Sequence, residues 1–119
     1  MARTLEQERA AYAWSVLKKK GSVPKEYVSA VSGAPALIMQ NGLLQAVAYF
    51  WNKDDKENRE VARHLMEWLA QRKLAKNGEL TTFLPSLMDA DASTYMRATE
   101  EAIALLKWLK HFGRSLEKG

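Results

Sequence analysis

The chain has 119 residues, contains no cysteine and carries a formal net charge of +4. This length predicts a single domain over residues 1–119, and the lack of cysteine excludes disulfides and thiolate metal sites and agrees with a reducing cytoplasm. The positive charge permits a nucleic-acid or acidic partner without requiring one, because basic residues must also be clustered to bind a polyanion.

The first predicted helix runs from about Leu5 to Lys20. Thr4 precedes it and Gln7 follows three residues later, which is the spacing of a capping box, and Gly21 gives a C-terminal stop. The N-terminal MARTLEQERA contains no apolar segment of the kind that a signal peptide needs. We therefore expect no secretion signal and a cytoplasmic protein.

Charged residues of this first helix have alternative interpretations. Arg9 lies within the apolar stripe, where a guanidinium either extends to solvent from the edge of the stripe or forms half of a buried ion pair. The helix ends in a run of lysines that includes Lys18 and Lys19. These charges either complement the negative end of the helix dipole or form the rim of a phosphate-binding surface.

A short helix is predicted over residues 22–31, and residues 32–35 should break the chain after it. The stretch from Pro35 to Trp51 (PALIMQNGLLQAVAYFW) has apolar side chains on every side of a helix, which is typical of a buried helix. Gln40 and Gln45 make it too polar for a membrane span. We interpret it as a buried central helix around which a soluble bundle packs.

Amide side chains fall on one side of this central helix. Asn41, Gln45 and Asn52 lie within about 40° of one another around its axis. Buried amides need partners, so these residues should either hydrogen-bond neighbouring helices or face a partner chain or a nucleic-acid backbone. Gly42 weakens a helix by about 1 kcal/mol relative to alanine, which suggests that a neighbouring helix passes close to the backbone there.

Three further segments complete the predicted bundle. After a polar turn whose acidic residues suit a helix start, the fourth helix should continue to about Leu74 and close at Asn77–Gly78. Residues 79–92 predict one or two helical turns that tolerate Pro85 near their start. The last helix should run from Ser93 to Phe112. Because no β pattern of note occurs, the sequence predicts an all-α, single-domain bundle of five to six helices.

The last helix carries Glu101 within its apolar stripe, as the first helix carries Arg9. Two lone charges of opposite sign on two apolar faces predict that Arg9 bonds Glu101 across the bundle, with a guanidinium–carboxylate distance below about 6 Å. The competing partner for Glu101 is Arg97, one turn earlier on the same helix.

Catalytic signatures are absent from the sequence. No nucleophile with a base, glycine-rich phosphate loop or HExxH pattern occurs, and the two histidines, His64 and His111, should have surface or packing roles. The pairs Asp54–Asp55 and Asp89–Asp91 are more typical of helix caps than of Mg²⁺ ligands. We therefore expect that the chain is not an enzyme and that it binds no cofactor and no metal ion.

One face of the last helix suits binding. Arg97, Trp108 and His111 share this face, and Lys110 lies farther round the helix. An exposed tryptophan beside basic residues suits RNA or a partner protein. The alternative is that Trp108 covers another helix.

Three segments, LEQERAAYAW, PALIMQNGLLQAVAYF and YMRATEEAIALLKWLKHF, resemble the small-subunit family of the type III-B CRISPR effector, the fifth subunit of the Cmr RNA-silencing complex. The resemblance spans nearly the whole chain. It implies a non-catalytic subunit whose copies stack into a short inner filament beside the backbone subunits and help to hold guide RNA and target RNA. Target cleavage would belong to the backbone subunit, and nucleotide cyclisation or DNA cleavage to the large subunit.

The resemblance also guides the choice of contact residues. We assign Arg9 and Glu101 to structure and expect RNA or subunit contacts from six residues: Lys18, Lys19, Asn41, Gln45, Arg97 and Lys110. The expected partners are the other Cmr subunits, guide and target RNA, and further copies of the chain, with no membrane. A subunit that accepts any guide should contact phosphates and duplex shape, so an isolated copy should bind RNA weakly, and more weakly as salt rises.

Two other classes of protein remain as alternatives. A helix-turn-helix DNA regulator needs a basic recognition helix after a tight turn, and no such pair stands out. A protein-only adaptor would use its tryptophans as anchors in a groove without nucleic acid. RNA of discrete length that co-purifies with the chain would discriminate among these classes.

Overall fold

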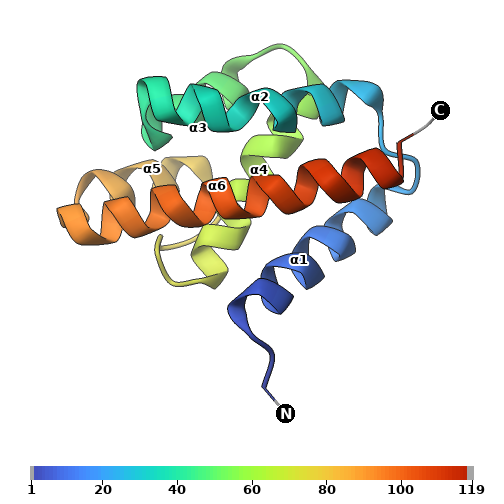
Figure 1. The fold of residues 1–119 in the computed structure, drawn as a ribbon. Coiled ribbons are helices and arrows are strands. Elements are labelled where there is room, and N and C mark those ends of the chain that lie inside the picture. The colour runs from blue at the N-terminus through green and yellow to red at the C-terminus, as the bar shows by residue number, and fades with distance from the viewer. Residues whose placement is uncertain (1, 118–119) are drawn as a thin grey trace.

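The computed structural model describes residues 2–117, and within that range six α-helices make up the fold (Figure 1). They are α1 (Leu5–Lys20), α2 (Lys25–Asn41), α3 (Leu43–Asn52), α4 (Lys56–Gln71), α5 (Leu80–Met88) and α6 (Ala92–Ser115). The predicted all-α bundle is confirmed. Among the described residues the one sheet-like pairing is an isolated bridge between Val23 and Glu117. The outermost residues of the predicted domain, 1 and 118–119, lie outside the described range.

Local sequence signals determine α1 as predicted. The Gln7 backbone N–H donates to Thr4 Oγ1 at 3.1 Å, and the Thr4 N–H donates to Gln7 Oε1 at 2.8 Å, which completes the capping box. Gly21 ends the helix at φ +78°, a conformation that glycine adopts without strain. Both ends of α1 therefore follow from residues within or next to it.

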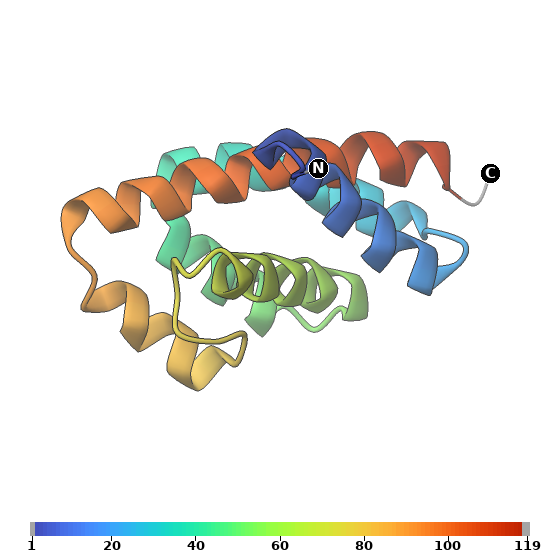
Figure 2. The ribbon, with the colours of Figure 1, turned by 90° about the horizontal axis from the view of Figure 1, so that it is seen from below.

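The helices form two layers, which Figure 2 shows from below. Helices α1, α2 and α6 lie in one layer, and α3, α4 and α5 lie in the other. In Figure 1, α2 and α6 run antiparallel beside each other. One hydrophobic core joins the layers and receives fully buried side chains from all six helices, including Leu17, Val31, Val47, Leu65, Phe83 and Leu105.

The predicted continuous helix over residues 35–51 is wrong. Helix α2 ends at Asn41, and α3 begins at Leu43. Gly42, at φ +89°, separates them, and its N–H donates to the Ile38 carbonyl at 2.7 Å. Because glycine lacks a Cβ, it can leave the helical conformation here and turn the chain.

The predicted break at residues 32–35 is also wrong, because α2 continues through Pro35. Proline removes one helical hydrogen bond and usually ends or kinks a helix. Here Val31, Ala34 and Ile38 bury one continuous face of α2 in the core. The burial of this face outweighs the local cost of proline.

The 35–51 segment is not enclosed on all sides either. Met39 and Tyr49 are 74% and 48% exposed, although other apolar residues of the segment, such as Val47, are fully buried, so one face of it lies in the core and another at the surface. Three helices pack against three or more others, and α2 is one of them, with α3, α4 and α6 as its neighbours. Helix α4 packs against α2, α3, α5 and α6, and α6 packs against α1, α2 and α4.

The second half of the chain follows the prediction more closely. Asp55 caps α4 by accepting hydrogen bonds from the Glu57 and Asn58 N–H groups. The helix ends at Gln71, before the predicted end near Leu74, and α5 accommodates Pro85. No helix among residues 2–117 combines the length and the hydropathy that a membrane crossing needs.

Candidate nucleic-acid and subunit interface

An ion pair between Arg9 of α1 and Glu101 of α6 ties these helices together. Arg9 donates from Nε to Glu101 Oε2 at 2.6 Å and from Nη2 to Oε1 at 2.9 Å, well within the predicted limit. Trp68 of α4 donates its indole N–H to the same carboxylate at 2.9 Å. Burial raises the pKa of Glu101, but the bonds from Arg9 and Trp68 outweigh it, so the pKa lies below its ordinary value. The competing partner, Arg97, is exposed and does not take part.

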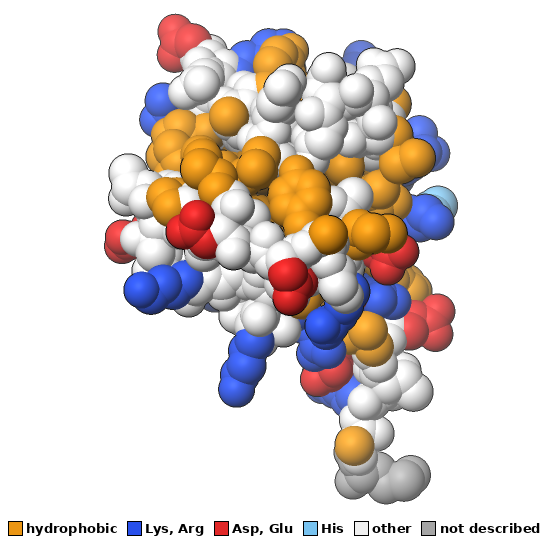
Figure 3. All heavy atoms as spheres, turned by 90° about the vertical axis from the view of Figure 1, so that its left-hand side faces the viewer, with side chains coloured by type: hydrophobic (Ala, Val, Ile, Leu, Met, Phe, Trp, Pro, Cys, Tyr) orange, Lys and Arg blue, Asp and Glu red, His pale blue; other side chains and the backbone are white. Residues whose placement is uncertain are grey.

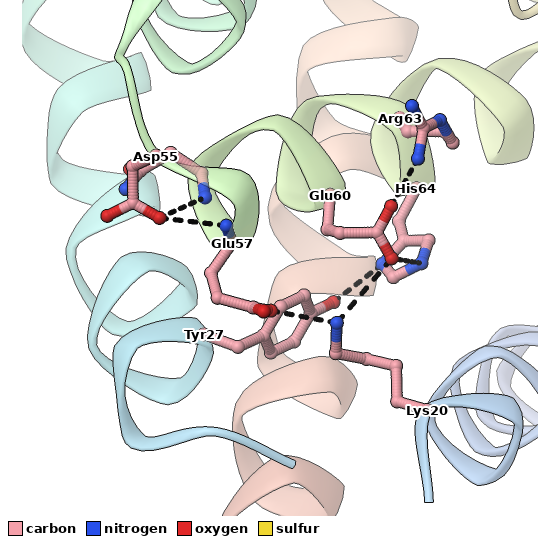
Figure 4. Close-up of polar contacts among 8 residues, drawn as sticks. Lys20, Tyr27, Asp55, Glu57, Glu60, Arg63 and His64 are labelled. Carbon is pink, nitrogen blue, oxygen red and sulfur yellow. Dashed lines mark hydrogen bonds and ion pairs between the residues drawn. The ribbon is translucent and has the colours of Figure 1, made fainter.

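A second polar cluster, between α1, α2 and α4, contains His64 (Figure 4). The Tyr27 hydroxyl lies 2.7 Å from His64 Nδ1, and Lys20 Nζ lies 2.8 Å from Glu57 and 3.5 Å from Glu60. Burial lowers the pKa of His64 to about 4, although Glu60 acts in the opposite direction. His64 is therefore neutral near pH 7 and has a packing role in this cluster.

The predicted amide residues do not lie between helices. Asn41, Gln45 and Asn52 are all exposed, so the interpretation that they hydrogen-bond neighbouring helices is wrong. The prediction that a neighbouring helix approaches Gly42 is confirmed, since a Cβ at this position would lie 3.6 Å from Tyr95 Oη of α6. That same hydroxyl accepts a hydrogen bond from the Leu44 N–H at 3.2 Å.

The six predicted contact residues fall into two separate groups. Asn41, Gln45 and Arg97 belong to the end of the molecule where Tyr95 meets the α2–α3 junction. Lys18, Lys19 and Lys110 belong to the other end, where α1 meets the C-terminal half of α6. Arg97 and Lys110 are about 20 Å apart along α6 at 1.5 Å per residue. These residues therefore form two surfaces and not one site.

An apolar surface accompanies the first group. Hydrophobic side chains gather on the face shown in Figure 3, which is the left-hand side of Figure 1. Three methionines lie at helix ends on this side of the molecule: Met39 near the end of α2, Met88 at the end of α5 and Met96 near the start of α6, and they are 74%, 62% and 62% exposed. We call this surface the methionine end. The sequence alone does not reveal this surface, because methionine at helical spacing is also typical of a core.

An aromatic groove lies beside the second group, between α1 and α6. Phe112 contacts Trp14 and Trp108, with ring centroids 5.3 Å apart in both cases, and Lys18 Nζ lies 5.7 Å from the Trp14 ring. Next to these rings is a groove of about 420 Å³. It is lined by Glu6, Arg9, Ala104, Lys107, Trp108 and His111. Trp108 is half-buried and packs against the core, so it both covers the bundle and lines this groove.

The two ion-pair clusters therefore lie between helices, where they join them, and the predicted contact residues lie on the two surfaces. No group of three or more His, Asp or Glu side chains that could hold a metal ion forms among residues 2–117. The fold and its surfaces define a small all-helical bundle with one apolar end and one basic, aromatic face.

Comparison with known proteins identifies the family. Residues 5–116 match the family model described as CRISPR-associated protein (Cas_Cmr5). The chain belongs to the Cmr5 family, and the resemblance found in its sequence is confirmed.

A curated protein and a solved structure from Thermus thermophilus illustrate the match. The chain is 28% identical over 116 residues to the "CRISPR system Cmr subunit Cmr5", with 96% of each chain covered. The crystal structure of a CRISPR-associated Cmr5 family protein from this organism gives a TM-score of 0.79 at 26% identity. That alignment covers 98% of this chain and 100% of the other. The two-layer arrangement of helices therefore matches an experimentally determined member of the family.

Proposed function

We propose that the chain is a non-catalytic structural subunit of a type III-B Cmr ribonucleoprotein, in which its copies stack as an inner filament that supports guide RNA and target RNA. The observation that carries this proposal is the match to the Cmr5 family over residues 5–116. A relative that is named as a Cmr subunit also aligns with this chain over 96% of both chains. The other Cmr subunits, the two RNAs and further copies of the chain are its proposed partners, in the cytoplasm.

The internal polar clusters support a scaffolding role. Glu101 joins α1, α4 and α6 through Arg9 and Trp68, and the His64 cluster joins α1, α2 and α4. Buried polar groups that are paired across helices favour a single arrangement of those helices, because a shift would leave a buried polar group without its partner. A subunit held in this way presents its surfaces in a fixed relative position.

The two ends of the molecule suit different partners. A linear stack needs two different complementary surfaces on each subunit, because a surface that pairs with itself closes into a dimer. The methionine end, with Asn41, Gln45 and Arg97 nearby, differs in chemistry from the end that carries Lys18, Lys19 and Lys110. We assign the methionine end to one of the two subunit contacts that a stack needs, and the basic end to RNA.

RNA contact through lysines is independent of sequence. Phosphate contacts position a nucleic acid but do not read its bases, which suits a subunit that must accept any guide. Lys18 and Lys19 are exposed and form no ion pair among residues 2–117. A few such contacts bind weakly in one copy, and repetition along a filament makes the total binding strong.

Affinity purification from the native host tests this proposal. The chain carries an affinity tag, and both the protein and the RNA that co-purify are analysed. We expect several other proteins and RNA of discrete length. Recovery of the chain alone, or with proteins but without RNA, would contradict the proposal. Catalytic turnover by the purified chain would contradict its non-catalytic part.

A further inference from the structure

The aromatic groove between α1 and α6 carries an inference that rests on the proposed contact with RNA. We propose that this groove binds an unpaired base of single-stranded RNA, with Trp108 as the stacking surface and Lys107 as the contact to an adjacent phosphate. The groove would thereby add a base-stacking contact to the phosphate contacts made by the lysines of α1.

The size and lining of the groove suit a flat, partly polar ligand. Its volume of about 420 Å³ lies within the range of sites that hold small organic molecules. The lining combines the ring of Trp108 and the small Ala104 with polar groups from both helices. A nucleobase has this mixed character, because its faces are apolar and its edges carry hydrogen-bonding groups.

Packing holds the stacking surface in place. The Trp108 ring lies against Phe112, with an interplanar angle of 46°, and Phe112 in turn contacts Trp14 edge-on at 82°. Trp108 is half-buried against the core while it also lines the groove. An aromatic ring that is already fixed loses little conformational entropy when a base stacks on it.

A fixed donor lies on the α1 side of the groove. Arg9 uses Nε and Nη2 to bond Glu101, which holds its guanidinium in one position. Its side chain nevertheless keeps 24% of its surface exposed and lines the groove. A guanidinium has five N–H donors, so Arg9 retains N–H groups that can reach the edge of a bound base.

The charges around the groove favour a polyanion. Glu101 neutralises Arg9, and Glu6 is the acidic residue that lines the groove. Lys107 lines the groove, and Lys18 stands over Trp14, whose ring contacts Trp108 only through Phe112; neither lysine forms an ion pair within the described part of the chain. An RNA strand can supply both a base for Trp108 and phosphates for these lysines.

The test compares two probes of equal charge. A labelled ten-nucleotide oligouridylate and an abasic strand of the same length are titrated with the full chain, and binding is followed by fluorescence anisotropy. Trp108→Leu keeps apolar volume but removes the aromatic face, and Trp51→Leu is the matched control. Trp51 is a half-buried tryptophan on α3, outside the groove, with Arg59 5.1 Å from its ring centre. Circular dichroism melting verifies that both variants fold.

We expect the wild type to bind the oligouridylate more tightly than the abasic strand. Trp108→Leu should lower the affinity for the oligouridylate roughly 5- to 100-fold and leave the affinity for the abasic strand unchanged. Trp51→Leu should behave as the wild type. Trp108→Phe should retain most of the binding, and it decides the outcome if the leucine variant does not fold.

Two results would overturn the inference while leaving the proposed function intact. One is equal binding of both probes by the wild type, which would indicate that the groove receives something other than a base, such as an aromatic side chain of a neighbouring subunit. The other is unchanged binding of the oligouridylate by a folded Trp108→Leu variant. If the wild type bound neither probe at millimolar protein, the proposed RNA contact would fail as well.

Discussion

Removal of the Glu101 carboxylate should destabilise the fold more than any other single change to a charged residue on α6. Glu101 is only 7% exposed and accepts three hydrogen bonds, two from Arg9 and one from Trp68. In Glu101→Ala the guanidinium loses its partner and the buried indole N–H has no acceptor. Breaking a fully buried ion pair costs about 3 to 5 kcal/mol, and an orphaned neutral donor adds about 1 to 3 kcal/mol.

The exposure of Arg9 reduces this cost. Its side chain is 24% exposed, so water solvates part of the freed guanidinium. We therefore expect Glu101→Ala to lower the free energy of unfolding by about 3 to 4 kcal/mol, or Tm by roughly 12 to 16 °C for a domain of this size. Urea denaturation followed by circular dichroism measures the change.

The neighbouring residue provides a matched control. Glu100 is exposed and makes no ion pair among residues 2–117, so Glu100→Ala should change stability by less than about 0.5 kcal/mol. A double-mutant cycle with Arg9→Ala should give a coupling energy above about 1 kcal/mol. If Glu101→Ala cost less than about 1 kcal/mol, or the two substitutions were additive, the carboxylate would not be the tie between α1, α4 and α6.

Three further predictions concern pH, the helix junction and RNA. The pKa of His64 falls from 6.5 to about 4 on folding, so the unfolded chain takes up the proton first as the pH drops. Roughly 3 kcal/mol of stability that is present above pH 6.5 should therefore be lost as the pH falls towards 4. Urea titrations at several pH values measure this loss, and His64→Gln should make the stability depend less on pH. Gly42→Ala should cost about 1 to 2 kcal/mol in urea denaturation because φ is +89° there, and an unchanged midpoint would refute this. The double variant Lys18→Ala/Lys19→Ala should weaken the binding of all RNA sequences alike and reduce the slope of log Kd against log salt by roughly 1 to 2. Loss of binding for one RNA sequence only would contradict phosphate contact.

Local signals explain what the sequence could predict. The ends of α1 depend on Thr4, Gln7 and Gly21, which act on the helix that they flank. The ion pair between Arg9 and Glu101 could be predicted because each charge is alone within an apolar stripe. Two buried charges of opposite sign are more stable as a pair than apart.

Tertiary packing explains where the prediction of the fold failed. The helix through Pro35 depends on core contacts of Val31, Ala34 and Ile38, which no local rule includes. The apolar composition of the same segment predicts that it is enclosed, yet Met39 is the most exposed large hydrophobic residue among residues 2–117. An apolar residue on a helix indicates burial only when another element of the fold covers that face.

The candidate site was predicted only in part for a related reason. The basic residues and Trp108 stand out in the sequence by type. The contact of Trp14 with Phe112 and the cluster of Tyr27, Lys20 and Glu57 around His64 join different helices, so no spacing along the chain reveals them. These contacts depend on the relative positions of α1, α2, α4 and α6.

Native mass spectrometry of the assembly purified from the host through a tag on this chain tests the central claim most directly. We predict one particle whose mass comprises other Cmr subunits, RNA of discrete length and more than one copy of this chain. A particle that contains the chain without RNA, or the chain as a lone monomer, would contradict the account.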